Sequence, residues 1–128
     1  MDGAKSSSQA IASGVAQGSV LGPLLFVLYF RDLPSGVKGT CALFADDTLV
    51  YDTSCDGSAL CCRLQTDLDG VAAWAHDWQN VFNAEKSALM VISRKKIHAR
   101  EVLLNEVPFS TVSIVKHLGV TISNNLCR

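Results

Sequence analysis

An apolar stripe at helical spacing between residues 57 and 82 restricts the fold of this chain more than any other feature. Its members recur at steps of three and four residues: Leu60, Leu64, Leu68, Val71, Ala75, Trp78 and Phe82. Trp74 borders the stripe. The charged residues interpreted as lying outside it are Arg63, Asp67, Asp69 and Asp77. Because an amphipathic helix buries its apolar face, the pattern predicts one long helix over residues 57–82, with Asp56 as its N-cap.

A second helix is predicted over about residues 20–32. A glycine-rich stretch ends at Ser19, which can cap a helix, and Pro23 is tolerated in a first turn. The apolar side chains that follow are distributed all round the helix, so we expect other elements to cover most of its sides.

The remaining regular structure is predicted to be short strands. The β-prone runs occupy residues 40–44, 48–51, 87–92, 102–104, 107–109 and 114–122. Residues 45–47 form the tip of the first hairpin, Asn105-Glu106 the turn of the second, and Leu118-Gly119 the bend of the third. The order predicts an α+β fold in which two helices pack on one face of a small antiparallel sheet.

Composition excludes several classes of protein. With 48% hydrophobic and 18% charged residues, the 128-residue chain is globular and large enough for one modest domain. Its net charge of −1 does not by itself indicate a nucleic-acid partner. The five cysteines form no CxxC pair, which favours reduced thiols inside a cell over a zinc or disulfide framework. The longest apolar run, residues 23–30, is too short to span a membrane.

Asp46 and Asp47 are the strongest candidates for chemistry. Two adjacent carboxylates repel each other unless a positive charge neutralises them, and a divalent cation prefers such oxygen ligands. A solvated turn is the competing interpretation, and the dipeptide alone favours that alternative.

The motifs around these aspartates resemble those of reverse transcriptases from non-LTR retrotransposons. They read GVAQGSVLGPLLF at residues 14–26, DLP at 32–34, LFADDT at 43–48 and VKHLGVTI at 115–122. Trp74 with Trp78, Phe82-Asn83 and Lys86-Ser87 continue the similarity, which covers about residues 6–126.

The resemblance implies the palm of a right-hand polymerase that holds two Mg²⁺ (or Mn²⁺) ions and acts on an RNA template, a DNA primer and a deoxynucleotide. Residues 14–128 would be a partial palm domain and residues 1–13 a polar N-terminal segment. A retrotransposon polymerase would act in the nucleus, and no membrane association is implied.

The resemblance also assigns roles to individual residues. Asp46 is implied as a metal ligand, Asp47 as its less demanding neighbour, and Lys86 as a residue that protonates or stabilises the leaving pyrophosphate. An ordinary strand-end lysine is an equal alternative for Lys86. The implied template- and substrate-binding residues are Gln17, Gly18, Phe44 and Ala45. The implied primer grip is Leu118 with Gly119, for which the alternative is an ordinary hairpin turn.

Several positions depart from the family pattern. Ala16 replaces a usual proline, Phe30-Arg31 replaces a small β-branched residue and an asparagine, and Asn105-Glu106 replaces Asn-Gly. Nothing in residues 1–13 resembles the strand that carries the family's first catalytic aspartate, and the fingers and thumb are not recognised. We therefore expect a fragment that is inactive alone. The alternatives are a non-catalytic module that binds nucleic acid or protein, and an untranslated or unstable product of gene prediction.

A basic stretch follows the predicted strand at residues 87–92. It comprises Arg94, Lys95, Lys96, His98 and Arg100. Phosphate contact is one interpretation, and a charged turn in solvent is the favoured one.

Overall fold

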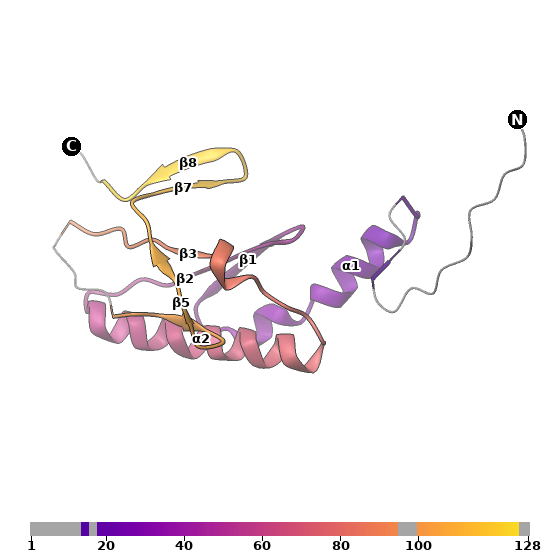
Figure 1. Ribbon diagram of the computed structural model, residues 1–128, viewed down its shortest axis with the longest axis horizontal. Helices are drawn as coiled ribbons and strands as arrows, with labels where there is room; N and C mark the ends of the chain where they lie inside the picture. Colours follow the sequence, from indigo (N-terminus) through magenta and orange to yellow (C-terminus); the bar gives the residue numbers. More distant parts are fainter. Residues whose placement is uncertain (1–13, 16–17, 95–99, 126–128) are drawn as a thin grey trace, which may run out of the picture. The chain divides into compact units, whose positions relative to one another are not determined.

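The computed structural model describes residues 14–15, 18–94 and 100–125 of the chain (Figure 1). These residues belong to two compact units, residues 1–31 and residues 32–128. The basic stretch at residues 94–100 lies mostly outside the described residues. Its two described members, Arg94 and Arg100, are exposed.

The described part of the first unit contains one helix, α1 (Gly22–Phe30), which is shorter at both ends than the predicted range of 20–32. Pro23 lies in the first turn, as predicted, but the N-cap is Leu21 and not Ser19. The hydroxyl of Ser19 still accepts a hydrogen bond from the N–H of Gly22 at 2.9 Å. Four apolar side chains of α1 are 47–65% exposed: Leu24, Leu25, Val27 and Leu28. The described part of this unit contains no second layer that covers them.

The second unit is organised around α2 (Gly57–Asp77). Asp56 caps its start, since the carboxylate accepts a hydrogen bond from the N–H of Ser58 at 2.9 Å. The predicted end at residue 82 is wrong by five residues. Gln79 adopts a φ of 54°, and the N–H of Asn80 returns to the carbonyl of Ala75 at 2.7 Å. This is a Schellman motif, and it stops the helix although the left-handed residue is not glycine.

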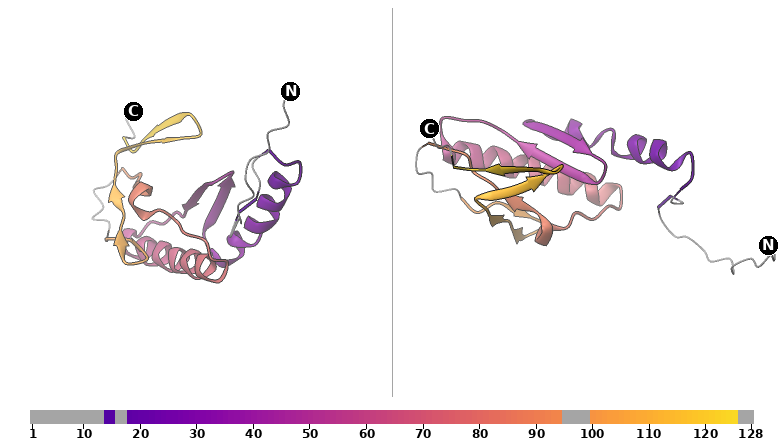
Figure 2. Two further views of the ribbon diagram at one scale, coloured as in Figure 1. Left: turned by 45° about the vertical axis from the view of Figure 1, so that its right-hand side comes forward. Right: turned by 90° about the horizontal axis from the view of Figure 1, so that it is seen from above.

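The core of the second unit lies along one side of α2. Its buried apolar residues are Leu33, Cys61, Leu68, Val71, Ala75, Val102 and Leu104. Leu33 belongs to η1 (Leu33–Gly36), and Gly70 lets that turn approach closely. A Cβ on Gly70 would lie 2.7 Å from the carbonyl oxygen of Gly36. Leu104 comes from β4 (Leu103–Leu104), which contacts α2. Figures 1 and 2 show α2 beside the strands of this unit.

The strands do not form the single antiparallel sheet that was expected. Their bounds are β1 (Thr40–Phe44), β2 (Asp47–Tyr51), β3 (Ala88–Leu89), β4 (Leu103–Leu104), β5 (Val107–Pro108), β6 (Ser110–Thr111), β7 (Ile114–His117) and β8 (Val120–Ser123). Among the described residues they make four two-stranded sheets. The pairs β1–β2, β4–β5 and β7–β8 are antiparallel, while β3–β6 is parallel.

The predicted strand over residues 87–92 is largely absent. It contributes only β3, and the preceding residues form the short helix η2 (Ala84–Lys86). β3 pairs with a strand beyond the second hairpin. A pairing between segments so far apart in sequence leaves no local signal, which is why this parallel pair was not predicted.

The two later hairpins are confirmed, with turns that require left-handed backbone. Asn105 and Glu106 have φ values of 51° and 67°, and Leu118 and Gly119 have 49° and 82°. Consecutive positive φ values are typical of the type I′ turns that match the twist of paired strands. Glu106 and Leu118 carry a Cβ in this conformation, which is unfavourable by roughly 1–2 kcal/mol per residue.

None of the helices in the described part of the chain is long and apolar enough to cross a membrane.

Candidate functional site

The predicted aspartates lie at the tip of the β1–β2 hairpin. Phe44 pairs with Asp47, so Ala45 and Asp46 are the two residues of the turn, and Asp47 begins β2. Ala45 adopts a φ of 52°, a conformation that is costly for a residue with a Cβ. The turn is therefore tighter than the three-residue tip that was expected.

The two sides of this hairpin differ in exposure. Cys41, Leu43, Thr48 and Val50 are half-buried on one face. Phe44 on the opposite face is 61% exposed. Asp46 and Asp47 are both exposed, and neither side chain makes a hydrogen bond or ion pair with the described residues. Within the described residues, these two adjacent carboxylates are thus presented to solvent without a cationic side chain paired to them.

The donor chemistry of this tip fits a hard divalent cation. Carboxylate oxygens are the ligands that Mg²⁺ and Mn²⁺ prefer, and Asp46 and Asp47 supply them side by side. Across the described residues, no group of three or more His, Cys, Asp or Glu side chains is placed to hold a metal ion. The tip can therefore serve as part of an open site, in which other ligands complete the coordination.

Gly18 belongs to the first unit. It adopts a φ of 85°, a conformation that favours glycine over residues with a Cβ. Gln17 lies outside the described residues.

Lys86, Leu118 and Gly119 belong to elements other than the aspartate hairpin. Lys86 is exposed at the end of η2, where the side chain of Asn83 accepts a hydrogen bond from its backbone N–H at 3.1 Å. It is therefore a residue of a short helix and not of a strand end. Leu118 and Gly119 form the turn between β7 and β8, where Leu118 is 49% exposed.

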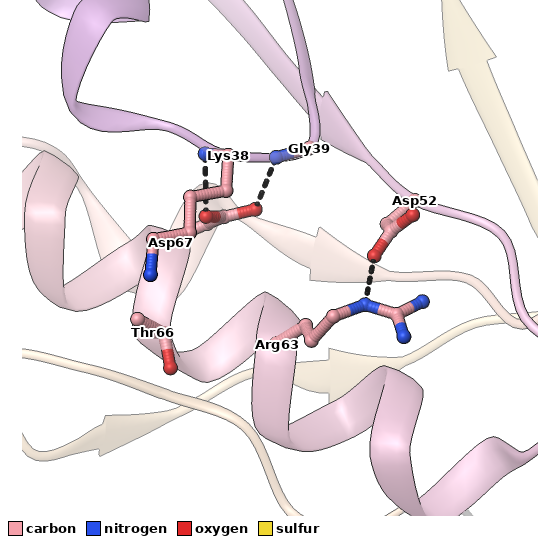
Figure 3. Close-up of a pocket in the computed structure, with 6 residues that line it drawn as sticks. All are labelled: Lys38, Gly39, Asp52, Arg63, Thr66 and Asp67. Carbon is pink, nitrogen blue, oxygen red and sulfur yellow. Dashed lines mark hydrogen bonds and ion pairs between the residues drawn. The ribbon is translucent and has the colours of Figure 1, made fainter.

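The base of the aspartate hairpin contains a buried carboxylate that sequence reasoning missed. Asp67 is 1% exposed, although it was placed outside the apolar stripe of α2. Its two oxygens accept hydrogen bonds from the backbone N–H groups of Lys38 at 2.8 Å and Gly39 at 2.9 Å (Figure 3). The spacing 60, 64, 67, 71 does put Asp67 in line with Leu60, Leu64 and Val71, and that signal could have found it.

A pocket of about 290 Å³ lies beside Asp67 (Figure 3). It is lined by Lys38, Gly39, Asp52, Arg63, Thr66 and Asp67. The Nε of Arg63 donates to the carboxylate of Asp52 at 2.6 Å, and this bond, with one from the N–H of Thr53, lowers the pKa of Asp52. Burial and, to a lesser extent, the charge of Asp67 raise the pKa of the Cys41 thiol.

The sequence matches the family described as reverse transcriptase (RNA-dependent DNA polymerase) over residues 1–122. It is 36% identical over 134 residues to the RNA-directed DNA polymerase from mobile element jockey of Drosophila melanogaster, covering 98% of this chain and 15% of that protein. It is 35% identical over 127 residues to a probable RNA-directed DNA polymerase from transposon X-element of the same species, covering 94% of this chain and 14% of that protein.

A third relative is a probable RNA-directed DNA polymerase from transposon BS of Drosophila melanogaster, which is 32% identical over 129 residues and covers 92% of this chain and 14% of that protein. The chain thus spans about one seventh of the length of the relatives it matches. No solved structure matches it. From the family match and these relatives, the chain belongs to the reverse transcriptase family, as the motifs of its sequence predicted.

Proposed function

We propose that this chain is part of the palm of an RNA-directed DNA polymerase, with Asp46 and Asp47 as ligands for Mg²⁺ or Mn²⁺. The observation that carries the proposal is the β1–β2 tip, where two exposed carboxylates lie side by side without a partner among the described residues. Residues 14–128 would form this partial palm.

Each part of the chain has a separate task in this proposal. Bound divalent cations supply activation of the primer 3′ hydroxyl and neutralisation of the leaving pyrophosphate. Asp46 holds a cation from the turn, and Asp47 supports it from the start of β2. Phe44 and Ala45 lie next to them in sequence, which favours a role for both in contacting the substrate.

The remaining tasks belong to residues outside the aspartate hairpin. Gln17 and Gly18 contact the template and the incoming deoxynucleotide, and Lys86 protonates or stabilises the leaving pyrophosphate. Leu118 and Gly119 steady the primer end. A left-handed leucine supports that last assignment, because strained backbone is concentrated at functional sites.

The partners of the whole polymerase are an RNA template, a DNA primer and a deoxynucleotide, and a retrotransposon enzyme of this kind acts in the nucleus. A non-catalytic module that binds nucleic acid or protein is the second candidate. It is favoured by the lack of a third acidic ligand near Asp46 and Asp47 within the described residues.

Primer extension tests the proposal. A polypeptide of these 128 residues should not extend a DNA primer on an RNA template with Mg²⁺ or Mn²⁺, because two-metal catalysis needs further carboxylates. The matching segment of the jockey polymerase should next be replaced by this chain. The chimera should extend the primer, and Asp46→Asn should abolish extension, whereas Asp77→Asn on the exposed end of α2 should not. Extension that survives Asp46→Asn would exclude the assigned role of Asp46.

A further inference from the structure

The first strand of the aspartate hairpin is held at its start by α2. Asp67 accepts one backbone N–H on each carboxylate oxygen, from Lys38 and from Gly39, and Gly39 directly precedes β1. A buried carboxylate that satisfies two amide donors is a strong and directional contact.

The second strand is held at its end by the same helix. Asp52 directly follows the last residue of β2, and its carboxylate accepts the Nε–H of Arg63 at 2.6 Å. A second nitrogen of Arg63 donates to the carbonyl oxygen of Thr53 at 3.0 Å. Arg63 and Asp67 are four residues apart, so they lie one turn apart on one face of α2.

Gly39 lies where the start of β1, the end of β2 and α2 come together. A Cβ at this residue would lie 2.8 Å from a carboxylate oxygen of Asp67 and 3.0 Å from the carbonyl oxygen of Tyr51. The start of β1, the end of β2 and the side chain of Asp67 therefore share a space that only glycine fits. Figure 3 shows the two bonds that Asp67 accepts from Lys38 and Gly39, and the bond from Arg63 to Asp52.

We infer that Arg63 and Asp67 are positioning residues that form a two-point clamp on the hairpin base and thereby set the place of the Asp46–Asp47 tip. This inference rests on the proposed function of that tip. A strand rises about 3.3 Å per residue, so a tip about 17 Å from the base moves by about 3 Å when the hairpin rotates by about 10°. Functional groups must be held within about 0.5 Å of their productive geometry, so a loose base would spoil the metal site.

The clamp is tested on the 128-residue chain with two measurements. Amide hydrogen exchange, followed by mass spectrometry on peptides that cover β1 and β2, reports the hairpin. Electron paramagnetic resonance of free Mn²⁺ reports cation affinity, and circular dichroism shows that each variant remains folded. The variants are Asp67→Asn and Arg63→Gln, with Asp77→Asn as the matched control because its side chain is 78% exposed on the same helix.

Asp67→Asn should accelerate exchange in β1 and β2 about tenfold, because it removes one of two charge-assisted bonds to a buried group. Arg63→Gln should accelerate it about twofold, since its partner is a surface carboxylate. Both should weaken Mn²⁺ binding, and Asp77→Asn should change neither quantity. Exchanging the charges with Arg63→Asp and Asp52→Arg together should restore much of the affinity lost in Arg63→Gln, which a purely packing role of Arg63 would not produce.

Hairpin exchange equal to that of the control in both variants would overturn the clamp. So would faster exchange with unchanged Mn²⁺ affinity, because Arg63 and Asp67 would then stabilise the fold without positioning the tip. If Asp67→Asn unfolds the chain, hydrogen exchange and Mn²⁺ affinity in Arg63→Gln and in the double variant with Arg63→Asp and Asp52→Arg decide whether the clamp exists. If Mn²⁺ binding to the parent chain does not depend on Asp46, the proposed function fails, and exchange in the peptide that contains the tip still decides the clamp.

Discussion

The carboxylate of Asp67 accepts a hydrogen bond from the backbone N–H of Gly39 at 2.9 Å. This bond joins the middle of α2 to the residue before β1, and so connects the core of the second unit to the hairpin that carries Asp46 and Asp47. Because Asp67 is 1% exposed, the bond lies in surroundings where an unsatisfied carboxylate would be costly.

Gly39→Ala should lower the free energy of unfolding by about 1–3 kcal/mol, because the added methyl group overpacks a site bounded by backbone and by a buried carboxylate. The measurement is urea denaturation of the two chains. Lys38→Ala is the matched control, since it keeps the backbone donor to Asp67 and removes only an exposed side chain. The control should stay within about 0.5 kcal/mol of the parent. Equal stability of all three chains would contradict the close approach at Gly39.

The Cys41 thiol should react slowly with iodoacetamide in the folded chain. Burial and the charge of Asp67 raise its pKa, and only the thiolate is nucleophilic. Peptide mass spectrometry should show that the rate–pH profile of Cys41 lies at higher pH in the folded chain than in urea.

The same shift predicts a pH dependence of stability. The folded-state pKa of Cys41 is raised, so its contribution is fully present below the unfolded pKa of about 8.5 and is lost as pH rises through the folded value. Cys41→Ser should remove this part of the pH dependence. An identical rate–pH profile of Cys41 alkylation in folded and unfolded chains would contradict the raised pKa on which both predictions for Cys41 rest.

Gln79→Gly should stabilise the chain by about 1 kcal/mol, because residue 79 is left-handed at the end of α2 and glycine adopts that conformation without a Cβ penalty. Thermal unfolding measures the change. Gln79→Ala is the control and should bring no such gain, since alanine keeps the Cβ. Stabilisation of the same size by alanine would show that the backbone of residue 79 is not the cause.

The start of α2 was predictable from sequence, and its end was not. Asp56 is a common N-cap type, and the apolar stripe that follows it has helical spacing, so both signals agree. At the other end, Gln79 takes a position where glycine is the usual signal, and apolar residues continue beyond it to Phe82. Because the apolar periodicity continued without a recognisable stop signal, the predicted helix was too long at this end.

The three hairpins were predictable because each joins neighbours in sequence, whereas β3–β6 joins residues 88 and 110 and has no local signature. The two aspartates at the hairpin tip were also identified from the sequence, because of the motif around them. Asp67 was missed because its charge was taken as evidence for a solvent-facing position. Burial of that carboxylate depends on the N–H groups of Lys38 and Gly39, nearly thirty residues earlier in the chain.

Paramagnetic broadening by Mn²⁺ in the ¹⁵N-resolved NMR spectrum of the 128-residue chain would show directly whether Asp46 and Asp47 bind a divalent cation. Broadening should be strongest at the amides around Asp46 and Asp47. Asp46→Asn should remove most of it, and Asp77→Asn should leave it intact. The binding should be weak, because two carboxylates leave most positions around the cation to water. Broadening centred on other residues, or unchanged by Asp46→Asn, would contradict the assignment of the hairpin tip as a metal-binding element.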